Sequence, residues 1–244
     1  MSAFFHRLSE LALIALLGLI PLLLAGLALR LLRRDRVVRA RGADGERQVA
    51  ATLAELDRPT LHDILIPDGR GGLTQIDHVL QLPGGLLALE TKHYQGDIDG
   101  GPDEPNWTQR LGGRRFTLPN PLRQNAGHVR ALQRLLPEAA VCGRVVFTDA
   151  ARFPTGVPEG VSRLSSLPAD LAPLLAVPAD DRAADAWRRL RRAARTDRKA
   201  RRAHRAQLRT RHGRDRRETL ALGLLAAAGI WATALVALAL VRRS

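Results

Sequence analysis

The chain has 244 residues and a formal net charge of +14, with 38 Lys and Arg residues against 24 Asp and Glu residues. Such a charge is typical of a basic protein that binds nucleic acid, but here it is confined to two short segments: residues 30–41 carry +5 and residues 188–217 carry +13, whereas residues 42–187 carry −5. A single cysteine excludes an internal disulfide scaffold and a zinc module of several cysteines, and a hydrophobic content of 45% excludes a wholly disordered chain.

Two uncharged stretches lie near the ends of the chain. Residues 11–29, which follow a short tail over 1–10, and residues 220–241 contain no charged side chain. At about 1.5 Å per residue, a helix of either length crosses a hydrocarbon core about 30 Å thick. A cleavable signal peptide is the alternative for the first stretch, but it is long for such a segment and runs into arginines without a small-residue cleavage site. The sequence therefore predicts two transmembrane helices.

The basic segments predict the orientation of these helices. Residues 30–41 form a basic juxtamembrane segment after the first span, and the Arg-rich residues 181–219 precede the second span. Positively charged flanks stay in the cytoplasm. We therefore expect residues 30–219 to be cytoplasmic and both termini to be extracytoplasmic, in the plasma (inner) membrane of a bacterium.

The Arg-rich segment over 181–219 contains no proline and only one glycine. It predicts one long helix that is polar on nearly all sides, because its few large apolar residues form a poor stripe. Arginines beside a membrane span attract anionic lipid, so anionic lipid is the expected partner of both basic flanks. Contact with nucleic acid is the alternative interpretation.

Residues 42–180 predict a mixed α/β domain, in which a sheet is flanked by helices between the two transmembrane helices. The pattern of apolar residues and turn residues predicts six elements. They are a helix over 42–58, strands over 61–66, 74–82 and 86–94, a helix over 121–136 and a buried strand over 141–148. A loop rich in glycine and proline is expected after the third strand.

Charged residues that suit catalysis lie in the predicted hairpin of the second and third strands. Glu90 and Lys92 share one face of their strand, because side chains alternate along a strand. A two-residue loop of Pro83 and Gly84 would set Asp77 opposite Glu90, whereas a three-residue loop would shift the pairing by one. Two facing carboxylates repel each other, unless they bind a hard divalent cation such as Mg²⁺. Such an ion activates water and stabilises phosphoryl charge, and a nearby ammonium can hold that water.

A Glu-x-Lys pair on a strand also occurs as a solvated ion pair without catalytic function. Two features favour a functional site here. Four apolar residues over 86–89 precede Glu90, so the charged residues extend a strand that is expected to be buried. Lys92 is the only lysine among 13 arginines in residues 42–187, and a compact ammonium differs from a guanidinium at a metal site.

Five runs of residues, in chain order, carry a resemblance to a known family. They are G-A-D-G-E at 42–46, T-Q-I-D-H-V at 74–79, L-E-T-K-H-Y-Q-G-D-I at 89–98, Trp107 with Gln109, and N-P-L-R-Q-N-A-G-H-V at 120–129. Together they resemble the nuclease-related domain (NERD), a family of the restriction-endonuclease-like PD-(D/E)XK superfamily. The resemblance covers about residues 42–150, and it implies a restriction-endonuclease-like fold.

The resemblance also implies roles for six residues of this chain. They are Asp77 and Glu90 as metal ligands, the Thr91 carbonyl as a third ligand, Lys92 as the group that positions the attacking water, Glu46 as an accessory acid and Gln124 as a residue that faces the site. Four histidines show no spacing that assembles a zinc site, and a solvated or hydrogen-bonded role is expected for each. They are His62, His78, His93 and His128. Two of them, His78 and His93, flank the acidic residues, so a minor role at the site stays open for both.

These features predict a membrane-anchored, Mg²⁺-dependent nuclease that hydrolyses phosphodiester bonds of nucleic acid. The alternative is a non-catalytic membrane protein whose nuclease-like domain binds nucleic acid or a protein partner. The net charge of −5 over residues 42–187 favours this alternative, because phosphate binding requires positive charge. The helix expected over 188–217 can supply that charge to a nuclease. A structural protein that uses this helix on a lipid surface would leave the acidic hairpin unexplained.

Overall fold

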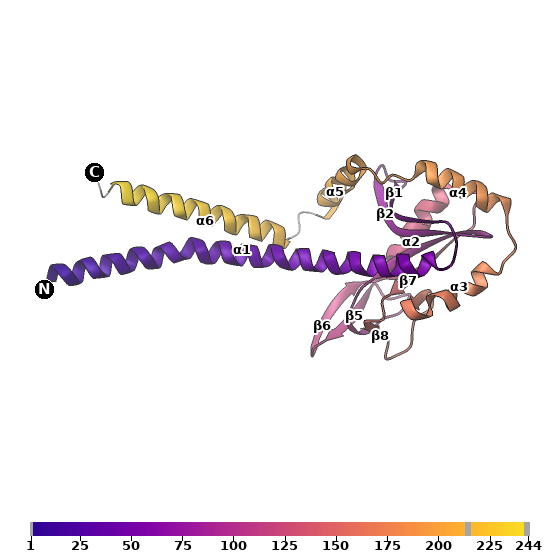
Figure 1. Cartoon of the computed structure of the whole chain (residues 1–244), viewed down its shortest axis with the longest axis horizontal. Coiled ribbons are helices and arrows are strands. Elements are labelled where there is room, and N and C mark those ends of the chain that lie inside the picture. Colours follow the sequence, from indigo (N-terminus) through magenta and orange to yellow (C-terminus); the bar gives the residue numbers. More distant parts are fainter. Residues whose placement is uncertain (1, 213–215, 242–244) are drawn as a thin grey trace. The chain divides into compact units, whose positions relative to one another are not determined.

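The computed structural model describes residues 2–212 and 216–241 (Figure 1); the side chains of 2–16, 35, 39, 211–212, 216–217 and 238–239 lie outside the description. The chain divides into two compact units. The larger unit comprises residues 40–208, and the smaller one combines the segment before residue 40 with the segment after residue 208. The long helix α1 (Ser2–Ala54) contributes to both units.

A five-stranded mixed sheet in the order β1-β2-β3-β7-β9 forms the centre of the larger unit. Its strands are β1 (Thr60–Pro67), β2 (Leu73–Leu82), β3 (Gly85–Lys92), β7 (Val141–Phe147) and β9 (Val161–Arg163). The first three strands are antiparallel, whereas β7 runs parallel to both β3 and β9. Leu82 pairs with Gly85, so the β2–β3 connection is the two-residue loop and not the three-residue alternative.

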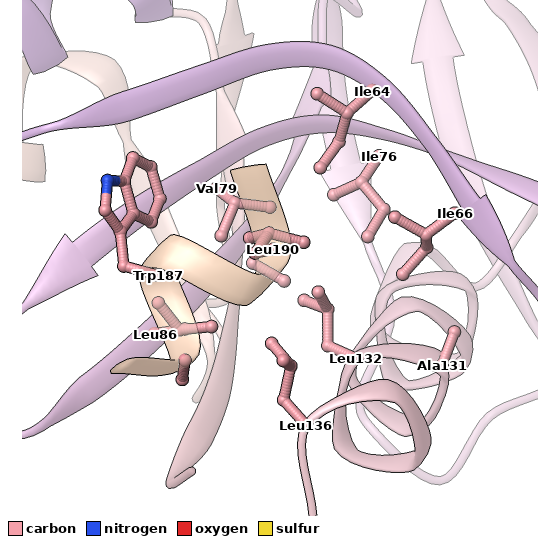
Figure 2. Packing of buried hydrophobic residues seen from close by; sticks show 12 residues of the cluster. Ile64, Ile66, Ile76, Val79, Leu86, Ala131, Leu132, Leu136, Trp187 and Leu190 are labelled. Atoms are coloured by element: carbon pink, nitrogen blue, oxygen red, sulfur yellow. The ribbon is translucent and has the colours of Figure 1, made fainter. Parts of the chain in front are cut away.

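One face of this sheet is covered by α2 (Pro121–Leu135) and α4 (Asp181–Ala193). Figure 2 shows how Leu132 of α2 and Trp187 and Leu190 of α4 meet side chains of β1, β2 and β3 in one apolar cluster. Burial of one large apolar side chain stabilises a fold by about 1.5–3 kcal/mol, so this cluster fixes both helices to the sheet. Asn120 caps α2 by accepting hydrogen bonds from two N–H groups of its first turn.

The other face is covered by the C-terminal part of α1 and by α3 (Leu167–Leu175). Leu53 of α1 and Leu171 of α3 are fully buried against Leu87 and Leu89 of β3. Because side chains alternate along a strand, β3 contributes to both cores. The mixed α/β class is therefore confirmed, with helices on both faces of the sheet.

The expectation of a single sheet with a long loop after the third strand is wrong. That region contains β4 (Gly96–Asp99), β5 (Asn106–Leu111) and β6 (Arg114–Pro119), which join β8 (Ala151–Arg152) in a second sheet of order β6-β5-β4-β8. The sheet forms because Trp107 of β5 and Ile98 of β4 are buried against Phe147 of the first sheet. The rings of Trp107 and Phe147 stack with centroids 6.0 Å apart.

The expectation of one long helix over 181–219 is also wrong. The helix ends at Ala193, and α5 (Arg198–His212) follows after a break in which Arg195 and Leu65 form an antiparallel bridge. Residues 213–215 of the expected helix lie outside the described residues. The compact unit therefore continues to residue 208, beyond the expected domain end at residue 180.

The Arg-rich segment belongs to the domain because α4 has an apolar stripe that its large side chains alone do not reveal. Ala183, Ala186, Trp187 and Leu190 are all buried, and their spacing of three, four and seven residues is that of one helix face. The small alanines complete the stripe. In α5, Ala200 is fully buried, so this helix also packs on the domain.

The smaller unit pairs α6 (Arg216–Val241) with the N-terminal part of α1. Within the described residues, one helix is long and apolar enough to cross a membrane, namely Glu218–Ala237 with a mean hydropathy of 2.1. This helix overlaps the second predicted span. The first predicted span, over 11–29, is helical within α1, but the side chains of residues 11–16 lie outside the description, and this span stays a prediction.

Candidate active site

Acidic residues from three elements meet at the C-terminal end of β3. The β2–β3 ladder pairs His78 with Leu89, so the next position along the ladder sets Asp77 beside Glu90. The helix α1 also reaches this point, because Gly45 is buried and a Cβ there would lie 2.7 Å from the Cβ of His93. The glycine of the G-A-D-G-E run thus allows close contact, and the next residue of α1 is the predicted accessory acid Glu46.

Lys92 is held by Glu90 and Gln124. Its ammonium donates hydrogen bonds to Glu90 Oε1 at 2.6 Å and to Gln124 Oε1 at 3.0 Å. Gln124 Nε2 donates in turn to Glu90 Oε1 at 2.7 Å. The side chains of Lys92 and Glu90 are only 15% and 4% exposed, so this ion pair differs from the solvated strand pair that was the alternative. The structure brings these three predicted site residues together.

His128 completes the surroundings of Glu90. Its Nε2 lies 3.1 Å from Glu90 Oε2, and its Nδ1 lies 3.0 Å from the Thr74 hydroxyl. With Glu90 ionised, Nε2–H donates a hydrogen bond to the carboxylate. The sequence interpretation gave His128 no role at the site. Its position four residues after Gln124 could have indicated a role, because residues i and i+4 lie on the same face of a helix.

The two strand carboxylates have pKa values shifted in opposite directions. Burial, together with the charge of Glu90, raises the pKa of Asp77 to about 8, although its carboxylate accepts a hydrogen bond from the Thr91 N–H at 2.9 Å. Burial also acts to raise the pKa of Glu90, but the hydrogen bonds and charges of His128 and Lys92 outweigh it and lower that pKa. Carboxylates with separated pKa values are typical of sites that handle protons or cations.

The pKa values of Lys92 and Glu46 are also shifted by burial and by neighbouring charges. Burial acts to lower the pKa of Lys92, but the charge of Glu90 and the hydrogen bond to it outweigh burial and raise that pKa. The ammonium is therefore fixed in its charged form. The pKa of Glu46 is raised by burial and by the charges of Asp63 and Glu90.

Comparison with known proteins agrees with this geometry. The family model of the nuclease-related domain, NERD, matches residues 41–148. These residues form a nuclease-related domain. An uncharacterised protein of Bacillus anthracis is 31% identical over 112 residues, which are 45% of this chain and 53% of that protein. The chain thus spans about half the length of this curated relative. No solved structure matches the chain.

The oxygen donors of the NERD site suit a hard divalent cation. Asp77, Glu90 and Glu46 offer three carboxylates against one ammonium, and the raised pKa of Asp77 is what a buried carboxylate has when it lacks a cation of its own. Within the described residues, no three side chains of His, Cys, Asp or Glu converge as a ready metal cage. Mg²⁺ takes few carboxylates and retains several waters, so carboxylates such as those of Asp77 and Glu90 are donors that fit it. The Thr91 carbonyl stays a predicted third ligand.

Asp63 is a further acidic residue near the site that sequence reasoning missed. The β1–β2 ladder pairs Ile64 with Ile76, so its register sets Asp63 opposite Asp77. Asp63 has a φ of 50°, an uncommon backbone conformation for a residue with a side chain. Its carboxylate accepts a hydrogen bond from Gln75 at 2.8 Å and forms an ion pair with Arg201 of α5. Asp63 could have been predicted at the site only if the register between β1 and β2 had been known.

Two more histidines support the backbone of the site. His62 Nδ1 and His78 Nδ1 lie 2.8 Å apart, and His78 Nε2 lies 3.2 Å from the Thr91 hydroxyl. Burial, with the neighbouring His62, lowers the pKa of His78 to about 4. His78 is therefore neutral at pH 7 and contributes hydrogen bonds but no charge. These contacts position Thr91, whose N–H bonds Asp77.

Proposed function

We propose that the NERD domain of this chain hydrolyses phosphodiester bonds of nucleic acid in a Mg²⁺-dependent reaction. One observation supports this most strongly: the Lys92 ammonium lies 2.6 Å from the buried carboxylate of Glu90 at the end of a buried strand, with Asp77 at the adjacent ladder position. Two carboxylates and an ammonium in this arrangement can hold a cation, a water and the developing charge of a phosphoryl group.

Each residue of the site has a distinct role in this proposal. Asp77 and Glu90 would hold the cation, with the Thr91 carbonyl as a third ligand, and the cation would supply acidified water and charge neutralisation. Lys92, oriented by Glu90 and Gln124, positions the attacking water and stabilises negative charge on the phosphate. The pKa of Glu46 is raised, and this carboxyl is the candidate proton donor to the leaving oxygen.

The assay for this activity uses the full chain purified in detergent with labelled DNA and RNA, each single- and double-stranded. We expect cleavage of at least one substrate in Mg²⁺ and none in EDTA. Asp77→Asn should abolish cleavage, because it removes a charged ligand and keeps the size of the side chain. Cleavage that persists in EDTA or in Asp77→Asn would refute the assignment.

A non-catalytic domain that binds nucleic acid or a protein partner is the second candidate. The observation that favours it is that both carboxylate oxygens of Glu90 already accept hydrogen bonds from side chains of the domain, namely Lys92, Gln124 and His128. Wild-type protein that binds the labelled nucleic acids but cuts none of them in Mg²⁺ would support this alternative.

We further propose that the smaller unit anchors the domain in a bacterial plasma membrane. Trp231 Nε1 of α6 donates a hydrogen bond to the Leu17 carbonyl of α1 at 3.1 Å, and Ala28 and Ala221 are fully buried. Large apolar side chains point outward instead, as in Leu23, which is 71% exposed. Small residues inside and large apolar residues outside are typical of helices that pair in lipid.

The charge distribution supports an orientation with the domain in the cytoplasm and both termini outside. In the sequence, arginines of residues 30–41 follow the first apolar stretch and arginines of residues 209–217 precede the second, so they would contact anionic lipid headgroups. A reporter fused after Ser244 should be active only outside the cytoplasm. A cytoplasmic signal from that fusion would contradict the proposed topology.

A further inference from the structure

The hairpin of β5 and β6 differs in charge from the rest of the domain. Residues 106–119 contain Arg110, Arg114 and Arg115 and no acidic residue, whereas residues 42–187 as a whole carry −5. Positive charge is therefore concentrated on one projecting element. Here we call residues 106–119 the arginine hairpin.

The outer strand of the arginine hairpin leaves its functional groups open to solvent. The strand β6 is the edge of the second sheet, and its residues Arg114, Arg115 and Phe116 are all exposed. Arg114 and Arg115 form no ion pair or side-chain hydrogen bond with any residue that the structure describes. Phe116 is 41% exposed, although an aromatic side chain gains stability from burial. Because side chains alternate along a strand, Arg114 and Phe116 lie on one face of β6 and Arg115 lies on the other. An unpaired guanidinium group beside an open aromatic ring indicates a surface that binds a ligand, and Arg115 adds unpaired charge at the same sheet edge.

The base of the hairpin packs against the first sheet and lies near the proposed catalytic residues. Trp107 is buried in the third apolar cluster, and Gln109 Nε2 donates a hydrogen bond to the Gln95 carbonyl at 2.8 Å. Gln95 comes three residues after Lys92, so their Cα atoms are at most about 10 Å apart along the chain. A strand of substrate at Lys92 can therefore reach the hairpin.

A hollow lies beside the inner strand of the hairpin. It has a volume of about 650 Å³ and is lined by Gln95, Arg110, Leu111 and Arg152, among others. Arg110 and Arg152 already have partners, because they pair with aspartates of β4. The unpaired charge available to a ligand thus lies at Arg114 and Arg115 of the outer strand.

We propose that the arginine hairpin binds single-stranded nucleic acid, with Arg114 and Arg115 on phosphates and Phe116 stacked on a base. This inference rests on the proposed nuclease function and names the form of its substrate. Exposed aromatic rings and cations bind single strands, because unpaired bases offer their faces for stacking. A duplex conceals those faces within its own stack, so it would leave Phe116 without a partner.

The test measures binding of fluorescein-labelled oligothymidylate to the full chain in detergent by anisotropy, with EDTA present so that cleavage does not interfere. The variant Arg114→Gln/Arg115→Gln should bind about tenfold more weakly, and the slope of log K against log salt should fall by about 1.4, since each phosphate contact on a single strand contributes about 0.7. The matched control is Arg58→Gln/Arg70→Gln, which removes the same charge from two exposed arginines elsewhere.

Phe116 supplies an independent readout. Phe116→Ala should weaken binding at least about fivefold, because stacking on one base contributes about 1 kcal/mol or more, and it should leave the salt slope unchanged. Phe116→Tyr should retain wild-type affinity, since it keeps the ring. Thermal melts of each variant identify any loss of folding.

The inference is overturned if the Arg114→Gln/Arg115→Gln variant binds as tightly as its control, or if Phe116→Ala binds like wild type. It is also overturned if the arginine variant loses binding to vesicles of anionic lipid but not to oligothymidylate, which would make the hairpin a lipid contact. Failure of the nuclease proposal is seen separately, in the Mg²⁺ cleavage assay. A chain that never cuts but loses oligothymidylate binding in these variants would refute only the nuclease proposal.

Discussion

Replacement of Asp77 by Asn gives a quantitative test of the buried acidic pair. Burial and the charge of Glu90 raise the pKa of Asp77 from 3.8 to about 8, so without a cation the folded chain keeps a proton that the unfolded chain releases. The bound proton therefore stabilises the folded chain relative to the unfolded chain. Its contribution to the free energy of unfolding is complete below pH 4 and is lost as the pH rises through 8. At about 1.36 kcal/mol per pKa unit, the shift corresponds to at most about 6 kcal/mol in the free energy of unfolding.

The assay compares thermal melts of wild type and Asp77→Asn in EDTA between pH 5 and pH 8.5, with the full chain in detergent. A change of 1 kcal/mol moves the melting temperature of a unit of this size by about 2–4 °C. We therefore expect the wild type to lose about 10 °C relative to the variant over this range. Groups that do not interact with Asp77 cancel in the difference.

Addition of Mg²⁺ at pH 8 provides the second half of this test. The wild type should regain stability, because the cation replaces the proton as the partner of Asp77, and Asp77→Asn should gain much less. Parallel curves of melting temperature against pH, or an equal response of both proteins to Mg²⁺, would refute the reasoning.

Three further substitutions test other parts of the structure. Gly45→Ala should destabilise the fold by about 1–3 kcal/mol in denaturant titrations, because its Cβ has no room; Gly42→Ala, in open space on the same helix, should stabilise it by about 0.5–1 kcal/mol. Trp187→Ala should cost about 3–5 kcal/mol, whereas Leu208→Ala, at a site 41% exposed, should change stability by less than about 0.5 kcal/mol. His128→Asn should raise the pKa of its glutamate partner, so the acid limb of the rate–pH profile should move to higher pH.

Much of the first sheet could be predicted from the sequence, because its signals are local. A proline and two glycines between apolar strands predicted a tight turn but left a two-residue and a three-residue loop open; the structure has the two-residue loop, which sets the register of Asp77 and Glu90. The strand over 141–148 could be recognised from its continuous apolar run, which is typical of a strand covered on both faces. The family resemblance, which rested on motifs from these elements, is confirmed over residues 41–148.

The remaining features depend on contacts between residues far apart in the chain. The strands of the second sheet are short and mostly exposed, and they depend on the packing of Trp107 against Phe147. The apolar face of α4 depends on alanines, whose small size gives a weak hydrophobic signal. The contact of His128 with Glu90 joins residues 38 positions apart, and neither residue reveals its partner locally.

The most direct test of the central claim is the single-turnover cleavage rate of Lys92→Met at saturating Mg²⁺. This substitution keeps most of the side-chain length and removes the ammonium that contacts Glu90. The matched control is Lys199→Met, which changes the only other lysine of the chain at an exposed position on α5. The account predicts a loss of at least about 100-fold for Lys92→Met and a wild-type rate for Lys199→Met. Cleavage by Lys92→Met at the rate of its control would contradict it.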